Sequence, residues 1–75
     1  MKATLEFDLP EDNCRHILAV HAIDWAVTTM DMDNYLRGKL KYEELPEDVY
    51  EALDKAREEL YEIMGSRDIS FDMIE

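Results

Sequence analysis

Polar and apolar side chains alternate over the first nine residues of the chain. The apolar positions are Ala3, Leu5, Phe7 and Leu9. A period of two is typical of a strand with one buried face. A lone strand needs a partner, and the alternation returns at residues 69–73, Ile-Ser-Phe-Asp-Met. We therefore predict an N-terminal strand that pairs with this C-terminal extended segment or with the same strand of a second copy.

A long helix is predicted next, from about residue 10 to about residue 40. The segment Asp8-Leu-Pro-Glu-Asp is a helix-start signal, because Asp8 can cap free N–H groups and Pro10 fits a first turn. One apolar stripe at helical spacing consists of Cys14, Leu18, Ala22, Trp25, Met32, Leu36 and Leu40. A second stripe consists of Ile17, Val20, Ile23, Val27 and Met30.

This predicted helix has more apolar surface than one partner helix covers. At ~1.5 Å per residue, a helix of about 30 residues is ~45 Å long, which exceeds the span of a compact domain of this size. We interpret the extra length and the second apolar stripe as an interface between copies of the chain. The sequence therefore predicts a homo-oligomer.

A second, antiparallel helix is predicted after a short connection. The first helix should end between Arg37 and Tyr42, where Gly38 is either a C-terminal residue or a weak point in a continuing helix. Pro46 suits the first turn of the second helix and Gly65 its end. The apolar stripe of this helix is Val49, Leu53, Ala56, Leu60 and Ile63. The predicted fold is α+β and mainly α, a helical hairpin flanked by short strands, in a single domain of residues 1–75.

Composition restricts the partners and the compartment. The chain has 75 residues, 19 acidic against 8 basic side chains, and a formal net charge of −11. This charge disfavours direct binding to nucleic acids or anionic membranes and favours basic partners. Cys14 is the single cysteine, so no disulfide forms within the chain. The N-terminal residues lack the apolar run of a signal peptide or a membrane span, and we expect a cytoplasmic protein.

The residues that could perform chemistry form no recognisable catalytic or metal-binding set. The soft or imidazole ligands are Cys14, His16 and His21. They do not place four side chains around a metal ion. The segment Asp31-Met-Asp-Asn begins like a calcium loop, but Leu36 and Tyr42 stand where glycine and glutamate are required. No nucleophile motif or glycine-rich phosphate loop is present, and we predict no enzyme activity, no metal and no cofactor.

Residues 35–42, Tyr-Leu-Arg-Gly-Lys-Leu-Lys-Tyr, form a cationic segment on this acidic chain. In a helix, its cations and aromatic rings lie three or four residues apart and converge on a compact anion. Such a set suits phosphates with a stacked base, and Trp25 or Arg57 would join if the second helix folds back. The candidate ligand-binding residues are Arg37, Lys39, Lys41, Tyr35, Tyr42, Trp25 and Arg57.

The cationic segment also has a structural explanation, which stays open. Cations in the last turn of a helix stabilise its dipole by roughly 0.3–1 kcal/mol. The neighbouring Glu43, Glu44 and Glu47 would then neutralise these cations locally. On the residues alone, this explanation is favoured over a ligand site.

Four stretches of the chain resemble a group of small acidic proteins encoded by tailed bacteriophages. These stretches are the first twelve residues, Met-Lys-Ala-Thr-Leu-Glu-Phe-Asp-Leu-Pro-Glu-Asp, residues 25–33, the cationic segment, and Glu51-Ala-Leu-Asp-Lys-Ala-Arg-Glu-Glu-Leu with Ile63 beyond it. The family usually has Asn or Ser in place of Gly38, so the helix end is expected to differ here. The resemblance implies a phage accessory protein that acts in the host bacterial cytoplasm and has no known reaction.

Two functional hypotheses follow, both by analogy with small phage proteins that counter host immunity. In the first, the oligomer sequesters an anionic nucleotide second messenger on the candidate residues. In the second, the chain is an acidic interaction protein or DNA mimic that occludes a basic surface of a host defence protein. A structural or regulatory phage subunit without a small ligand is a third interpretation.

Overall fold

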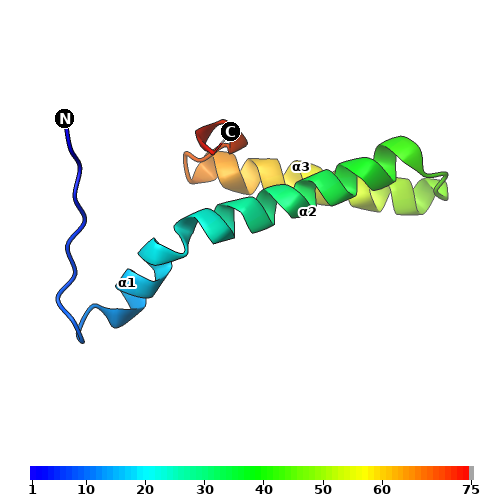
Figure 1. Ribbon diagram of the computed structural model, residues 1–75. Coiled ribbons are helices and arrows are strands. Elements are labelled where there is room, and N and C mark those ends of the chain that lie inside the picture. Colours follow the sequence, from blue (N-terminus) through cyan, green and yellow to red (C-terminus); the bar gives the residue numbers. More distant parts are fainter. Residues whose placement is uncertain (75) are drawn as a thin grey trace.

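Three α-helices and one short 3₁₀ helix are the regular elements of residues 1–74, the part of the chain that the computed structural model describes. The elements are α1 (Asn13–Val20), α2 (Ala22–Tyr42), α3 (Glu47–Ser66) and η1 (Phe71–Met73). Figure 1 shows that α2 and α3 form an antiparallel hairpin, while α1 extends away from it and the N-terminal residues are extended. None of these helices combines the length and apolar composition that crossing a membrane requires.

The prediction of an α+β fold with terminal strands is wrong. Residues 1–74 contain no strand, and residues 1–8 have no regular secondary structure. At the C-terminal end, the N–H of Met73 donates to the carbonyl of Ser70 at 3.2 Å, so this backbone closes the turn of η1 instead of pairing with a strand. The ring of Phe7 lies 5.4 Å from the ring of His16. A period-two pattern describes a strand only where a second strand accepts its hydrogen bonds.

The predicted long helix exists but begins later and is interrupted once. Asp8 does not cap it: the carboxylate of Asp12 instead accepts a hydrogen bond from the N–H of Asp8 at 3.0 Å, and α1 begins at Asn13. His21 separates α1 from α2, with φ −98° and ψ 13°. Its carbonyl still accepts from the N–H of Trp25 at 3.0 Å. The ribbon therefore bends at His21 without a loss of helical hydrogen bonding at that carbonyl (Figure 1).

The predicted second helix is confirmed as α3. Gly38 lies within α2, which ends at Tyr42, inside the predicted window. Pro46 directly precedes the first residue of α3. Gly65 does not end α3, because the helix continues to Ser66.

The contact between α2 and α3 is narrow. Within residues 1–74, Met64 is the one buried apolar side chain and Asp33 the one buried polar side chain. Half-buried residues of the contact are Ala26, Met30, Leu36 and Leu40 on α2 and Leu53, Arg57 and Leu60 on α3. Val49 and Ile63 belong to the predicted stripe of α3 but are 40% and 47% exposed. The buried face of α3 is thus rotated from the predicted stripe toward Arg57 and Met64.

The C-terminal end of α3 is closed by a Schellman motif. The N–H of Ile69 donates to the carbonyl of Met64 at 3.1 Å, and the N–H of Asp68 donates to the carbonyl of Gly65 at 3.1 Å. This motif places its C′ residue in the left-handed region, and Asp68 has φ 56°. Glycine is the usual residue at this position because it has no Cβ to clash. The chain therefore holds an aspartate where the backbone favours glycine.

We expect Asp68→Gly to raise the free energy of unfolding by about 0.5–1 kcal/mol, because glycine adopts this φ without steric cost. Urea titration followed by circular dichroism, at one fixed protein concentration, measures the change. Asp68→Ala is the matched control, since it removes the same charge but keeps the Cβ. Equal stabilisation by both substitutions would contradict a backbone origin.

Candidate functional site

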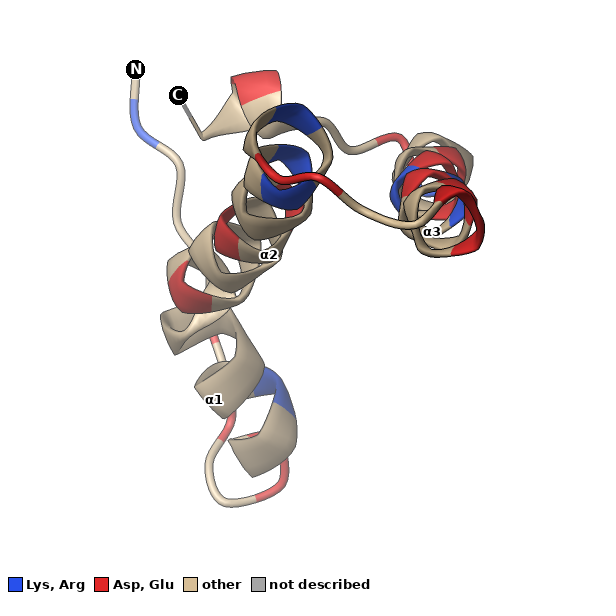
Figure 2. Ribbon diagram, turned by 90° about the vertical axis from the view of Figure 1, so that its right-hand side faces the viewer, with Lys and Arg blue, Asp and Glu red and all other residues tan. Residues whose placement is uncertain are grey.

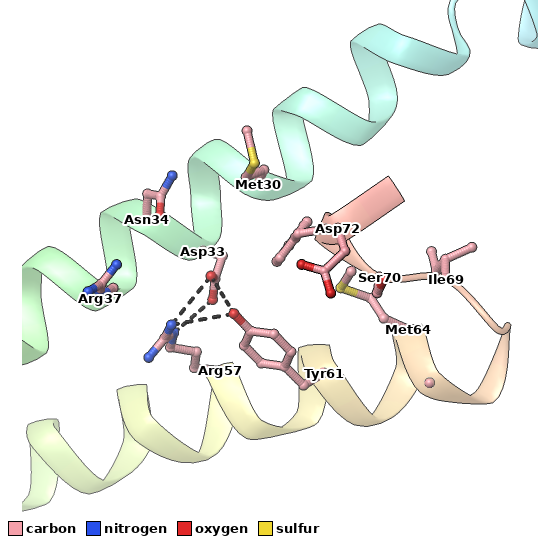
Figure 3. A pocket seen from close by; sticks show the side chains of 12 residues that line it. Met30, Asp33, Asn34, Arg37, Arg57, Tyr61, Met64, Ile69, Ser70 and Asp72 are labelled. Atoms are coloured by element: carbon pink, nitrogen blue, oxygen red, sulfur yellow. Dashed lines mark hydrogen bonds and ion pairs between the residues drawn. The ribbon is translucent and has the colours of Figure 1, made fainter. Parts of the chain in front are cut away.

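A buried carboxylate joins the two arms of the hairpin. The side chain of Asp33 accepts a hydrogen bond from Nε of Arg57 at 2.7 Å and another from the hydroxyl of Tyr61 at 2.7 Å. A longer contact, 3.4 Å, joins Nη2 of Arg57 to the second carboxylate oxygen. Asp33 is 3% exposed. Figure 3 shows these three residues, the Asp33 cluster, between α2 and α3.

Helical spacing assembles the Asp33 cluster. Asp33 lies on the side of α2 that faces α3, in line with Met30 and Leu36. Arg57 and Tyr61 are four residues apart on α3, so their side chains share a face, and the guanidinium lies 5.5 Å from the centre of the tyrosine ring. Two donors from one helix therefore meet one acceptor from the other.

The cluster stabilises its own charged state. Burial alone would raise the pKa of Asp33, but hydrogen bonds from Arg57 and Tyr61, with the positive charges of Arg57 and Arg37, outweigh burial and lower this pKa. The hydrogen bond to Asp33 raises the pKa of Arg57 and also that of Tyr61. At neutral pH the cluster is an ionised carboxylate, a guanidinium and a neutral phenol.

A cavity of about 490 Å³ opens beside the Asp33 cluster. Its polar lining comes from α2, α3 and the C-terminal residues, and consists of Asp33, Asn34, Arg37, Arg57, Tyr61, Ser70 and Asp72. Its apolar lining includes Met30, Met64, Ile69 and Phe71. Two arginines face two aspartates, so the lining is close to neutral on a chain of net charge −11. We refer to this space as the hairpin cavity.

An aromatic pair forms one wall of the hairpin cavity. The rings of Tyr61 and Phe71 lie 5.8 Å apart at 84°, an edge-to-face contact. Phe71 belongs to η1, so the C-terminal turn is packed onto the hairpin by this contact. A second, apolar cavity of about 140 Å³ shares Met64 and Phe71 with the hairpin cavity and is also lined by Ala26.

The structure divides the seven candidate ligand-binding residues into three groups. Arg37 and Arg57 both line the hairpin cavity. The Lys39 ammonium lies 3.1 Å from a carboxylate oxygen of Glu43 and 5.4 Å from the ring centre of Tyr35, and its hydrogen bond to Glu43 raises its pKa. The Lys41 ammonium lies 5.4 Å from the ring centre of Tyr42.

The two arginines are the first group, the two lysine–tyrosine pairs are the second, and Trp25 alone is the third. It lies near the other end of α2 and is 64% exposed. Its neighbours are His21 and Asp24, which are paired at 3.0 Å between Nδ1 and a carboxylate oxygen. Folding therefore brings together the two arginines, keeps the lysines in local pairs and leaves Trp25 elsewhere.

Sequence reasoning did not identify the residues that build the hairpin cavity around these arginines. The sequence places Asp33 only in a segment that fails as a calcium loop, whereas in the structure it accepts hydrogen bonds from Arg57 and Tyr61. The sequence did contain a signal for Asp33. It lies three residues from Met30 and three from Leu36, a helical spacing that places its carboxylate on the apolar, inward face. Ser70, Phe71 and Asp72 had no such signal.

Comparison with known proteins yields no match. No family model matches the chain, and no curated protein and no solved structure is significantly similar to it. Among residues 1–74, no group of three or more His, Cys, Asp or Glu side chains is placed to hold a metal ion.

Asp33→Ala should lower the free energy of unfolding by about 2–3 kcal/mol, because it removes two charge-assisted hydrogen bonds and leaves Arg57 facing the helix contact without its acceptor. Urea titration provides the measurement. Asp31→Ala is the control on the same helix, since Asp31 is exposed and should change stability by no more than about 0.5 kcal/mol. An equal loss in both variants would show that the Asp33 cluster contributes nothing specific.

The stability that Asp33 supplies should depend on pH. The folded-state pKa lies below the ordinary value of 3.8, so this contribution is complete above that value and is lost as the pH falls through the folded-state pKa. We expect the difference in unfolding free energy between the wild type and Asp33→Asn to be constant from about pH 7 to about pH 5 and to shrink below about pH 4. A difference that grows on acidification would contradict the assigned direction of the shift.

Proposed function

We propose that this chain is a non-enzymatic bacteriophage accessory protein that sequesters an anionic nucleotide signal in the host cytoplasm and so counters host immunity. The hairpin cavity is the site at which the ligand binds. Arg37 and Arg57 are the cations that contact its phosphates. The observation that carries this proposal is the cavity itself, which gathers arginines from two helices beside the polar side chains of Asn34, Ser70 and Asp72 and an aromatic wall.

The size and chemistry of the hairpin cavity support a nucleotide-type ligand. A volume of about 490 Å³ lies within the range of small-molecule sites, roughly 300–1,000 Å³. Guanidinium groups bind phosphate through paired N–H donors. Asp72 provides an acceptor for the amino group of a base, and the rings of Tyr61 and Phe71 provide apolar area. A ligand with phosphates at one end and a base with amino groups at the other would contact both the arginines and the aspartates of the lining.

Arg37 is the principal anchor in this proposal. No hydrogen bond or ion pair holds its guanidinium within the described part of the chain, whereas Arg57 already donates two bonds to Asp33. Asn34, three residues earlier on α2, lines the same cavity. Arg37 therefore reaches a ligand without breaking an existing pair, and Arg57 reaches it only with the donors that Asp33 leaves free.

The acidic outer face of α3 supports a second candidate function, occlusion of a basic surface on a host defence protein. Helix α3 contains seven acidic and two basic residues, a net charge of −5. In Figure 2 more of its ribbon is red than blue. Glu51, Glu58 and Glu62 are exposed on it. Such a surface attracts a basic partner and raises its rate of association.

Titration calorimetry with a panel of cyclic and ADP-ribose-type nucleotides tests the first candidate. At least one ligand should bind the wild type with a Kd below about 10 μM, as competition with a host receptor requires. Arg37→Ala should weaken this binding at least about tenfold, because one charge-assisted contact contributes about 1.5–3 kcal/mol.

Lys55→Ala is the matched control, because it removes the same charge from the exposed side of α3 and should leave the Kd unchanged. Lys39→Ala separates the hairpin cavity from the rest of the cationic segment and should also have little effect, since Lys39 is held by Glu43. If no nucleotide binds below about 10 μM, sequestration is rejected. Retention of a basic host protein that depends on Glu51, Glu58 and Glu62 but not on Arg37 would then favour occlusion.

A further inference from the structure

The helix formed by α1 and the start of α2 projects past the end of α3. We call residues 13–25, which are α1 and the first turn of α2, the projecting segment; Figure 1 shows α1 extending away from the hairpin. No residue between positions 1 and 32 is buried. The large apolar side chains of the projecting segment are all more than half exposed: Ile17 55%, Leu18 58%, Val20 62%, Ile23 72% and Trp25 64%. These side chains lie on more than one face of the helix, and all remain exposed on both sides of the bend at His21.

The exposed area is too large for a chain that stays alone. A compact protein of 8.9 kDa exposes ~4,800 Å², whereas this chain exposes 6749 Å², an excess of ~1,900 Å². The radius of gyration, 16.9 Å, exceeds the ~11 Å expected for a compact chain of this length. Scattered exposed apolar residues are normal on a protein surface, but a contiguous apolar segment marks an interaction site.

Charge distinguishes the projecting segment from the rest of the chain. Residues 13–25 contain one arginine, Arg15, and one aspartate, Asp24, so their net charge is zero and the entire −11 lies elsewhere. In Figure 2, α1 and the adjoining turns of α2 are mostly tan, with few charged positions. Copies of an acidic chain repel one another at most surfaces. They approach at this segment without that repulsion.

We propose that a second copy of this chain covers the projecting segment, and that the apolar side chains of Ile17, Leu18, Val20, Ile23 and Trp25 form the core of a symmetric interface. Part of the excess belongs to the extended N-terminal residues, where Met1 and Leu5 are highly exposed. If two chains hide about half of the excess against each other, ~1,900 Å² is buried in total, which is the area of a stable, specific interface. A second copy supplies the same apolar area in the same geometry, as a two-fold axis requires. A strongly charged partner would find no complementary charge here.

This interface is separate from the hairpin cavity. Arg37 is twelve residues after Trp25, which places it ~18 Å farther along α2. A substitution that prevents self-association can therefore leave ligand binding unchanged, and the reverse. The proposed interface does not depend on the proposed function.

Sedimentation equilibrium tests the interface by the mass of the particle in solution. The wild type should sediment at two or more times 8.9 kDa at concentrations of about 10 μM. Ile23→Glu should raise the dissociation constant at least about a hundredfold, because a symmetric interface buries the new charge twice. Tyr50→Glu is the control: Tyr50 is 45% exposed on α3, the change adds the same charge, and the mass should not change.

Trp25 is the single tryptophan of the chain, so its fluorescence reports this interface in the unmodified protein. Its emission should shift to shorter wavelength as the protein concentration rises from about 0.1 μM to about 100 μM, because association removes the indole from water. If the wild type is associated throughout this range, its emission should lie at a shorter wavelength than that of the Ile23→Glu variant. A wild type that stays at 8.9 kDa, with constant tryptophan emission, would overturn the proposal. Dissociation of the Tyr50→Glu variant to the same extent as Ile23→Glu would also overturn the proposal.

Discussion

The hydrogen bonds that Arg57 and Tyr61 donate to the buried carboxylate of Asp33 are the constraint on which the hairpin depends. Apart from Met64, the described residues bury no apolar side chain, so apolar contact alone specifies little about how α2 and α3 align. The Asp33 cluster does specify it: sliding one helix by a single turn moves Asp33 by ~5.4 Å and leaves a buried carboxylate without donors. The cluster therefore selects one register of the two helices. That register places Arg37 and Asn34 opposite the C-terminal turn and so creates the hairpin cavity.

Charge is distributed unevenly over the same framework. Helix α2 contains three acidic and three basic residues and is neutral overall, whereas α3 has a net charge of −5. An anion that approaches the molecule meets the least repulsion along α2, where Arg37 lies. A second copy also meets the least repulsion there, at the neutral projecting segment. Helix α2 thus contributes to both of the surfaces that we propose to be functional, with its first turn to the interface and with its middle to the hairpin cavity. Helix α3 keeps an acidic face toward solvent.

Local patterns in the sequence were sufficient for the helices but not for the partners of each side chain. The existence of the two hairpin helices, the window in which α2 ends and the position of Pro46 before α3 follow from apolar periodicity and proline. The glycines did not mark the helix ends, since Gly38 lies within α2 and α3 continues past Gly65. The strands were wrongly predicted because alternation over residues 1–9 carries no information on whether another strand is available. The two arginines of the hairpin cavity were among the candidates, but Asp33, Tyr61 and Phe71 were not. Their contacts join residues more than 20 apart or depend on the turn after Asp68, which no short pattern encodes.

Two kinds of helix stabilisation are therefore combined in one chain. Between α2 and α3, side chains of the same chain satisfy one another through the Asp33 cluster. In the projecting segment, the large apolar side chains are more than half exposed in the single chain. Local stability should follow this division, because a segment that is covered only on association is ordered only when copies meet.

Amide hydrogen exchange at two protein concentrations, ~1 μM and ~500 μM, tests this account most directly. We expect the amides around Arg57 and Met64 to exchange slowly at both concentrations. Those of residues 13–25 should exchange rapidly in the dilute sample and become protected in the concentrated one. Protection of residues 13–25 that is the same at both concentrations, in a sample shown to be monomeric, would contradict the account.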